Sequence, residues 1–303
     1  MKQGIKSFIT VYLFGLFLAA NGYGQQLKGR WDYGLNGPVK KCTVLTSYGK
    51  ELYSFTRDGK LEQLISFYDE NNYQQISYTY KDRLLVERRI ELYEAGQLDQ
   101  EASVINIYQN DSTAILKREV IVDYKGRTLE ELNFSYDSLH QLIEIKKLTK
   151  NGQLTTQFSR LKDSLGHYKT TVLIDSVVKR QIDSIPALSM ELDSLINVRN
   201  VYFLDGIEDR AETLKYDHRA NVVYLKNELY LLDSNQWYVE KEEEFEFNEK
   251  DQMIKKITKE GTTTFTQNFV YQTDGTQYQN WVKQIVMPNM TYTTRIIEYF
   301  EEN

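Results

Sequence analysis

The stretch Leu-Leu-Val-Glu-Arg-Arg-Ile-Glu-Leu-Tyr, residues 84–93, decides the fold class. Its apolar side chains fall on alternate positions, interrupted once by Arg88: Leu84, Val86, Ile90 and Leu92. The positions between them carry Glu87, Arg89 and Glu91. A period of two residues is the mark of a β-strand with one buried face. Residues 84–93 therefore predict a strand that is apolar on one side and charged on the other.

Residues 237–247 repeat this pattern. Trp237, Val239, Phe245 and Phe247 are expected on one face, interrupted by Lys241 and Glu243, and the glutamates at 240, 242, 244 and 246 on the other. The chain also has 23 Tyr and 13 Phe but only 3 Pro. Aromatic and β-branched residues fit a pleated, half-buried surface, so the composition favours a β-sheet.

Short turn motifs separate the expected strands. They contain Asp, Asn or Gly, which accept the backbone conformations of tight turns. Their spacing of about 11 to 16 residues allows one strand and one turn per unit, as in a β-meander or a repeat array. The motifs lie at residues 57–59, 68–72, 81–83, 94–96, 124–126, 136–138, 150–152, 163–166, 216–219, 248–251, 260–261 and 273–275.

Several of these motifs have an aromatic residue before the turn and an aliphatic residue after it, as in Tyr136-Asp137-Ser138-Leu139-His140-Gln141-Leu142. In this the chain resembles the secreted YD-repeat, or Rhs-repeat-like, proteins. The opening segment 35–40 and the closing segments 280–283 and 295–299 resemble the ends common in such proteins. His140 and Ala220 replace the glycine of the unit. The resemblance implies an array of β-sheet repeats and assigns no single activity.

The first residues predict export. Lys2 and Lys6 precede an apolar stretch, Phe8–Ala20, and small or polar residues follow it. This is the order of a secretory signal peptide, and we expect cleavage after Gly24. The apolar stretch is shorter than the roughly 20 residues that cross a hydrocarbon core. No later segment is apolar enough to predict a membrane-spanning helix.

These patterns predict an all-β fold of repeated antiparallel hairpins that form a long twisted or curled sheet. The expected organisation is a signal peptide at 1–24, a β-repeat half at 25–174, an insert at 175–198 and a second β-repeat half at 199–303. Within the insert, helical spacing of apolar residues, a capping Ser184 and Pro186 predict a short amphipathic helix or an ordered loop. An extended linker is the alternative.

The charge balance and the cysteine count narrow the class of protein. The 37 basic and 43 acidic residues give a net charge of −6. Nucleic-acid binding would need a basic face, so no nucleic-acid partner is expected. Cys42 is the single cysteine, which excludes an internal disulfide. It lies in the alternating run 39–45 and is predicted to be a small buried hydrophobe rather than a reactive thiol.

No combination of residues in the sequence specifies a catalytic, cofactor or metal site. His140, His167 and His218 lie in or beside turns and lack ligand partners at metal-site spacing. Asp163, Ser164 and His167 are interpreted as turn residues rather than parts of a triad. The acidic run 240–251 predicts a solvated strand face, not a calcium site, with Lys255, Lys256 and Lys259 as cross-strand partners. Binding residues stay unassigned.

The leading functional hypothesis is an exported, non-catalytic β-repeat protein that offers a binding or scaffolding surface in the cell envelope. Its partner would be an envelope protein or polysaccharide, and no cofactor is expected. The compartment would be the periplasm, the outer surface or the medium. Two alternatives stay open: a secreted hydrolase acting on a polymer, and an outer-membrane β-barrel. Charges on both faces of strands such as 84–93 count against the barrel.

Overall fold

Twenty strands and one short 3-10 helix make up residues 28–185 and 196–301, the part of the chain that this computed structural model describes. The predicted signal peptide, 1–24, lies outside these residues. The elements are η1 (Arg30–Tyr33), β1 (Val39–Leu45), β2 (Lys50–Phe55), β3 (Leu61–Phe67), β4 (Tyr73–Lys81), β5 (Leu84–Glu94), β6 (Gln97–Asn110), β7 (Leu116–Asp123), β8 (Thr128–Tyr136), β9 (Leu142–Thr149), β10 (Gly152–Lys162), β11 (Tyr168–Ile174), β12 (Val177–Ile185), β13 (Ile196–Leu204), β14 (Ile207–Tyr216), β15 (Val222–Leu231), β16 (Gln236–Phe247), β17 (Met253–Glu260), β18 (Thr263–Thr273), β19 (Trp281–Met287) and β20 (Thr291–Tyr299). Among them, no helix has the length and apolarity that crossing a membrane demands.

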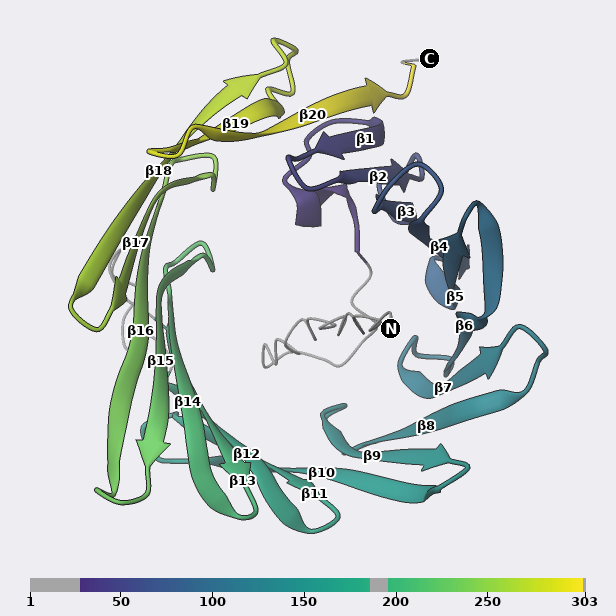
Figure 1. The fold of residues 1–303 in the computed structure, drawn as a ribbon. Coiled ribbons are helices and arrows are strands. Elements are labelled where there is room, and N and C mark those ends of the chain that lie inside the picture. Colours follow the sequence, from purple (N-terminus) through teal and green to yellow (C-terminus); the bar gives the residue numbers. More distant parts are fainter. Residues whose placement is uncertain (1–27, 186–195, 302–303) are drawn as a thin grey trace, which may run out of the picture.

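The strands close into a barrel. Each strand pairs antiparallel with the next along the chain, and β20 pairs antiparallel with β1, where Cys42 lies opposite Ile297. Figure 1 shows the strands arranged in a ring. The predicted all-β antiparallel class is confirmed. The predicted long twisted or curled sheet is instead closed into a barrel, because pairing of the first and last strands removes the two edges that an open sheet would expose.

A buried asparagine joins the two ends of the chain at this seam. Asn280, 1% exposed, accepts a hydrogen bond from the Asn36 amide at 2.7 Å and donates to the Asn36 carbonyl at 2.8 Å. It also donates to the Tyr299 hydroxyl at 2.7 Å, and Tyr299 donates to Asp274. Buried polar groups need such partners. The opening and closing segments singled out in the sequence therefore meet and seal the barrel.

The predicted insert at 175–198 is strand at both ends. Val177–Ile185 forms β12 and Ile196–Leu204 forms β13, and the two pair antiparallel. Ile182, 6% exposed, lies between Thr170 and Asn200 in the ladder. Residues 177–185 and 196–198 of the predicted insert are therefore sheet, which suits their β-branched side chains. The helix or loop predicted between Ser184 and Ile196 falls on residues 186–195, which lie outside the described part.

Bulges shift the predicted faces of two strands. In β16, Asn227 pairs with Lys241 but Glu228 pairs with Val239, so Glu240 is an extra residue. Because a bulge changes the side-chain alternation, Trp237 and Val239 lie on the face opposite to Phe245. The single apolar face expected for residues 237–247 is therefore wrong. In β5 a similar shift puts Leu85, 7% exposed, on the apolar face in place of Val86, and Leu84, also predicted on that face, lies on the opposite one.

Five turns at one rim of the barrel share the same hydrogen-bonding pattern. Asp111, Asp137, Asp163, Asp217 and Asn248 each accept hydrogen bonds from the amides two and four residues later. Each turn joins an even-numbered strand to the next odd-numbered one, so all five lie at the same end, which we call the capped rim. The cap holds the third residue after it in the left-handed region, with φ of 60° at His140 and 64° at Ala220. Side chains are tolerated there because the cap supplies local hydrogen bonds that favour the turn.

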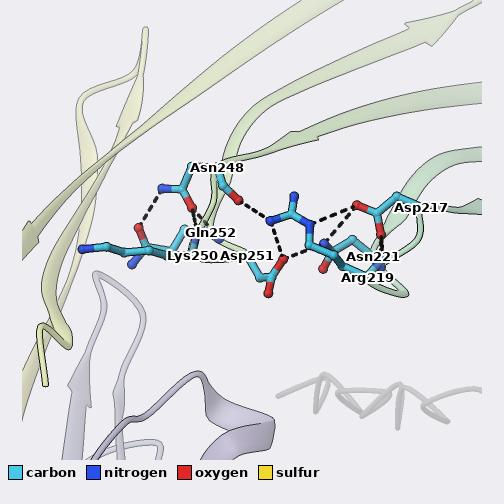
Figure 2. Close-up of polar contacts among 7 residues, drawn as sticks. All are labelled: Asp217, Arg219, Asn221, Asn248, Lys250, Asp251 and Gln252. Carbon is cyan, nitrogen blue, oxygen red and sulfur yellow. Dashed lines mark hydrogen bonds and ion pairs between the residues drawn. The ribbon is translucent and has the colours of Figure 1, made fainter. Parts of the chain in front are cut away.

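Neighbouring turns of the capped rim are bonded to one another. Figure 2 shows Arg219 donating to the Asn248 carbonyl at 2.9 Å and pairing with Asp251 at 3.0 Å. Asn221 also donates to Asp251 at 2.9 Å. Tyrosines add contacts between strands: the Tyr271 hydroxyl donates to the Met253 carbonyl at 2.8 Å. The capped rim is thus a bonded belt rather than a set of separate loops.

Candidate functional site: the barrel lumen

Helix η1 identifies the face of the sheet that looks into the barrel. It lies on the inner side of the ring beside β1 and β2 (Figure 1). The ring centroid of Tyr33 is 4.5 Å from that of Tyr53 and 5.9 Å from that of Phe55. Tyr53 and Phe55 therefore point into the lumen. Since directly opposed residues of neighbouring strands share a face, the register then assigns the lumenal side of every strand. Following it in either direction around the ring gives the same assignment.

The lumenal face is rich in apolar and aromatic side chains. One row runs from Tyr53 through Leu64, Ile76 and Ile90 to Val104. Further lumenal pairs are Phe158 with Val172, Val198 with Leu214, Leu214 with Leu225, and Phe269 with Val286. Barrels of 16 to 18 strands already leave an open channel, so a 20-stranded barrel is too wide for these side chains to fill.

Under η1 the lumenal face forms the one compact core of the described residues. Its buried members are Leu35, Val39, Cys42, Tyr53, Phe55 and Leu61. Leu61 and Val39 are fully buried. Burial raises the pKa of the Cys42 thiol to about 11. The prediction that Cys42 is a buried hydrophobe is confirmed, because its side chain is 1% exposed and the thiol stays protonated near neutral pH.

The side chain of Arg295 extends from the seam, where β20 pairs with β1, to η1. Its guanidinium stacks on the Trp281 ring at 3.5 Å and donates to the Tyr33 carbonyl at 3.0 Å. Its Nε and Nη1 atoms are buried and have no hydrogen-bond partner among the described residues. Burial lowers the pKa of Arg295. The indole face compensates part of this desolvation through a cation–π contact.

A polar cluster interrupts the apolar lining on β12, β13 and β14. Arg180 donates to the buried Asn200 at 2.7 Å, and Asn200 donates to Glu212 at 3.2 Å. The guanidinium groups of Arg180 and Arg210 lie 5.3 and 5.0 Å from the centre of the Tyr202 ring. On β6 and β7, Asn106 donates to Glu119 at 2.6 Å in a similar pair. These groups give the lumen fixed hydrogen-bonding sites within an apolar wall.

Basic and acidic residues are equally numerous on the lumenal face. The register places these basic residues there: Arg88, Lys147, Arg160, Lys162, Arg180, Arg210, Lys241, Lys256 and Arg295. The acidic residues are Glu51, Glu94, Asp99, Glu119, Asp123, Glu130, Glu212, Glu243 and Glu260. The lumen is therefore lined by apolar side chains and by charged side chains of both signs.

Ion pairs lie on both faces of the barrel: in the lumen Lys147 lies 2.8 Å from Glu130 and Lys256 lies 2.7 Å from Glu243, and further pairs lie on the outer face. Glu228, 6% exposed, is bonded by Arg199 and lies 3.1 Å from Lys226. Burial opposes ionisation of Glu228, but hydrogen bonds from Arg199 and Lys226 outweigh it and lower its pKa. Other outer pairs join Arg118 to Glu131 at 2.5 Å and Lys259 to Glu244 at 2.7 Å. The outer face therefore carries paired charges of both signs.

The structure keeps the histidines apart. His140, His167 and His218 lie in three different turns of the capped rim. His167 Nδ1 lies 3.0 Å from Asp163, and no hydrogen bond joins Ser164 to either. Within residues 28–185 and 196–301, no three His, Cys, Asp or Glu side chains are placed to hold a metal ion.

The basic partners predicted for residues 240–251 are found where β16 pairs with β17. On the outer face Lys255 pairs with Glu246 and Lys259 with Glu244, each at 2.7 Å. Lys256 instead pairs at 2.7 Å with Glu243, which is 5% exposed and lies on the lumenal face. The lumenal cluster around Asn200 was missed. The sequence signal that could have found it is Asn200 itself. It lies two residues from Val198 and two from Tyr202, at a position where the strand pattern predicts an apolar side chain.

Comparison with known proteins gives only distant likenesses. No family model and no curated protein matches the chain. Among solved structures, a porin-like protein from Bacteroides uniformis is 11% identical, with a TM-score of 0.36 over 87% of this chain and 99% of that one. A porin-like protein from Bacteroides vulgatus is 11% identical, with a TM-score of 0.23 over 86% and 98%. A chain of the TcdB2–TccC3–Cdc42 structure is 11% identical, with a TM-score of 0.32 over 73% of this chain and 15% of that chain. These likenesses are too distant to transfer a function, which must be inferred from the barrel's own residues.

Proposed function

We propose that this chain is a non-catalytic binding barrel of the cell envelope that encloses a partly apolar ligand in its lumen. One observation carries the proposal: apolar and aromatic side chains line the lumenal face of a barrel too wide for them to fill. Apolar surface gains about 25 cal/mol per Å² when it leaves water. A lumen too wide to fill itself therefore gains free energy by enclosing a ligand. Export to the periplasm, the outer surface or the medium is part of this proposal.

Two neighbouring residues of β18 test it. Phe269 lies on the lumenal face opposite Val286, whereas Val270, 45% exposed, lies on the outer face opposite Ile285. We expect 1-anilinonaphthalene-8-sulfonate, an apolar anion, to bind the purified protein saturably with enhanced fluorescence. Phe269→Asp weakens this binding several-fold because it adds a negative charge to the lumen, and Val270→Asp leaves it unchanged. Equal effects of the two substitutions, or no dye binding by the folded protein, contradict the proposal.

An outer-membrane β-barrel is the second candidate. It is favoured by the closed ring and the even number of strands in the described residues. The fold supports it better than it supports an open scaffolding sheet. The outer face counts against it, because each Arg or Lys at the bilayer midplane costs about 2–4 kcal/mol. Arg199 and Lys226 would both face lipid. Recovery of folded protein from membranes only with detergent would favour this candidate, and recovery without detergent excludes it.

A relationship to the YD-repeat proteins is also proposed rather than established. It is supported by the capped rim, where an aspartate or asparagine directly follows β6, β8, β10, β14 and β16. Tyr136-Asp137 and Tyr216-Asp217 are the two turns of the capped rim in which an aromatic residue and an aspartate stand together. Replacing Asp137 and Asp217 with alanine tests whether the unit matters for folding, since both changes remove caps from one rim. Unchanged thermal stability of the double variant would argue against the relationship.

A further inference from the structure

The hairpin of β15 and β16 extends beyond its neighbour at the end of the barrel opposite the capped rim. β16 pairs with β15 from Gln236 onward, but its pairing with β17 begins only at Glu242, opposite Lys259. In the described residues, no strand pairs with positions 236–241 on the side facing β17. This segment is an open strand edge, whose unpaired N–H and C=O groups are a template for a further strand. Figure 1 shows β15 and β16 in green beside β17.

A groove of about 400 Å³ lies along this open edge. It is lined by residues 237–240 of β16 and by Glu242, Lys259 and Gly261. Tyr238 is 50% exposed and Val239 is 38% exposed. The groove therefore combines free backbone groups with apolar side chains.

Three local features keep the groove open. Glu240 is the bulged residue of β16, so the strand bends where the edge begins. Gly261, with φ of 56°, turns the β17–β18 hairpin and has no atom within 4 Å of its missing side chain. The Trp237 ring is held by Arg199, whose guanidinium lies 5.0 Å from it, and by Tyr230 at 5.1 Å. The aromatic wall is thus fixed before any partner arrives.

The charges at the groove select a basic partner. Glu240 and Glu242 lie along it, and its one cation, Lys259, is already paired with Glu244 at 2.7 Å. Because Lys259 is engaged, the groove presents excess negative charge.

We propose that residues 236–241 of β16 bind an extended peptide segment of a partner protein by strand addition. The segment alternates apolar and basic residues. Backbone hydrogen bonds supply affinity in such complexes, and alternate side chains supply specificity. This site lies at the edge of the sheet, at the end of the barrel opposite the capped rim, and the proposal does not depend on what binds in the lumen.

A labelled peptide tests the proposal. The probe is a fluorescein-labelled heptapeptide of alternating lysine and valine, and the control is the same peptide with alternate backbone nitrogens methylated. We expect the probe to raise the fluorescence anisotropy saturably with the purified protein, and the methylated peptide to bind at least tenfold more weakly. Equal binding of the two peptides overturns strand addition.

Two charge reversals locate the site. Glu240→Lys places a cation in the groove, and Glu249→Lys makes the same change of charge at the capped rim, where β16 ends. We expect the first to weaken binding of the heptapeptide at least fivefold and the second to leave it unchanged. Equal weakening overturns the location. Sedimentation of the protein alone tests whether a second copy occupies the edge. A dimer that dissociates in the Glu240→Lys variant, and that the peptide does not displace, would show such occupation. That result overturns the proposal.

Discussion

Replacing Asn280 with alanine is the most direct test of how the barrel is closed. The substitution removes three hydrogen bonds, at 2.7, 2.8 and 2.7 Å, to Asn36 and Tyr299. Each contributes about 0.5–1.5 kcal/mol net to stability. The alanine also leaves the Asn36 amide and carbonyl without their partner beside a site that is 1% exposed. We therefore expect the free energy of unfolding to fall by about 3 kcal/mol.

Urea unfolding followed by Trp fluorescence measures this loss, since the free energy falls linearly with denaturant. Asn151→Ala is the matched control: Asn151 is exposed in the β9–β10 turn, and its side chain makes no hydrogen bond in the structure. We expect the control to stay within about 0.5 kcal/mol of the wild type, as surface substitutions usually do. If Asn280→Ala were as stable as this control, the seam would not depend on the asparagine and our account of closure would be refuted.

Three further predictions concern the core, the thiol and the turns. Leu61→Ala should lower the free energy of unfolding by about 2–5 kcal/mol, because Leu61 is fully buried, whereas Leu165→Ala, at an exposed turn, should not change it in the same urea experiment. Cys42 should resist Ellman's reagent at pH 8 in the folded protein and react in urea, since burial raises its pKa to about 11; rapid labelling without denaturant would contradict its placement. The Arg127 amide and side chain lower the pKa of Asp123, so this carboxylate stabilises the fold above its ordinary pKa of 3.8 and the effect is lost as pH falls through the lower folded-state value. Asp123→Asn should therefore lower the melting temperature at pH 7 and differ less from the wild type near pH 3; a constant difference would argue against this linkage.

The class of fold was predictable from local pattern, and its closure was not. Alternation in residues 84–93 correctly placed Glu87, Arg89 and Glu91 on the face opposite Ile90, because strand geometry is set by neighbouring residues. Whether a sheet closes depends on the summed twist and stagger of all its strands. The segments that pair at the seam were noticed in the sequence, yet nothing local shows that residue 36 meets residue 280.

Faces were mispredicted where an extra residue enters a strand. The bulge at Glu240 reverses which side chains of β16 face the lumen, and no residue type at that position predicts a bulge. For the same reason the lumen could not be recognised: Arg180, Asn200 and Glu212 are spread over three strands, and the register alone brings them together. The turns were easier, because Asp137 and Asp217 bond to amides only two and four residues away.

The pairing of β1 with β20 has a consequence for the order in which the protein can be completed. The contacts of Asn280 join residues separated by 244 positions. During synthesis, the first strand must therefore wait with one side unpaired until the last has emerged. Contacts so distant in sequence form slowly, and an unpaired strand edge invites aggregation meanwhile. A helper that shields the waiting edge would raise the yield of this protein more than that of a β-sheet built only from adjacent hairpins.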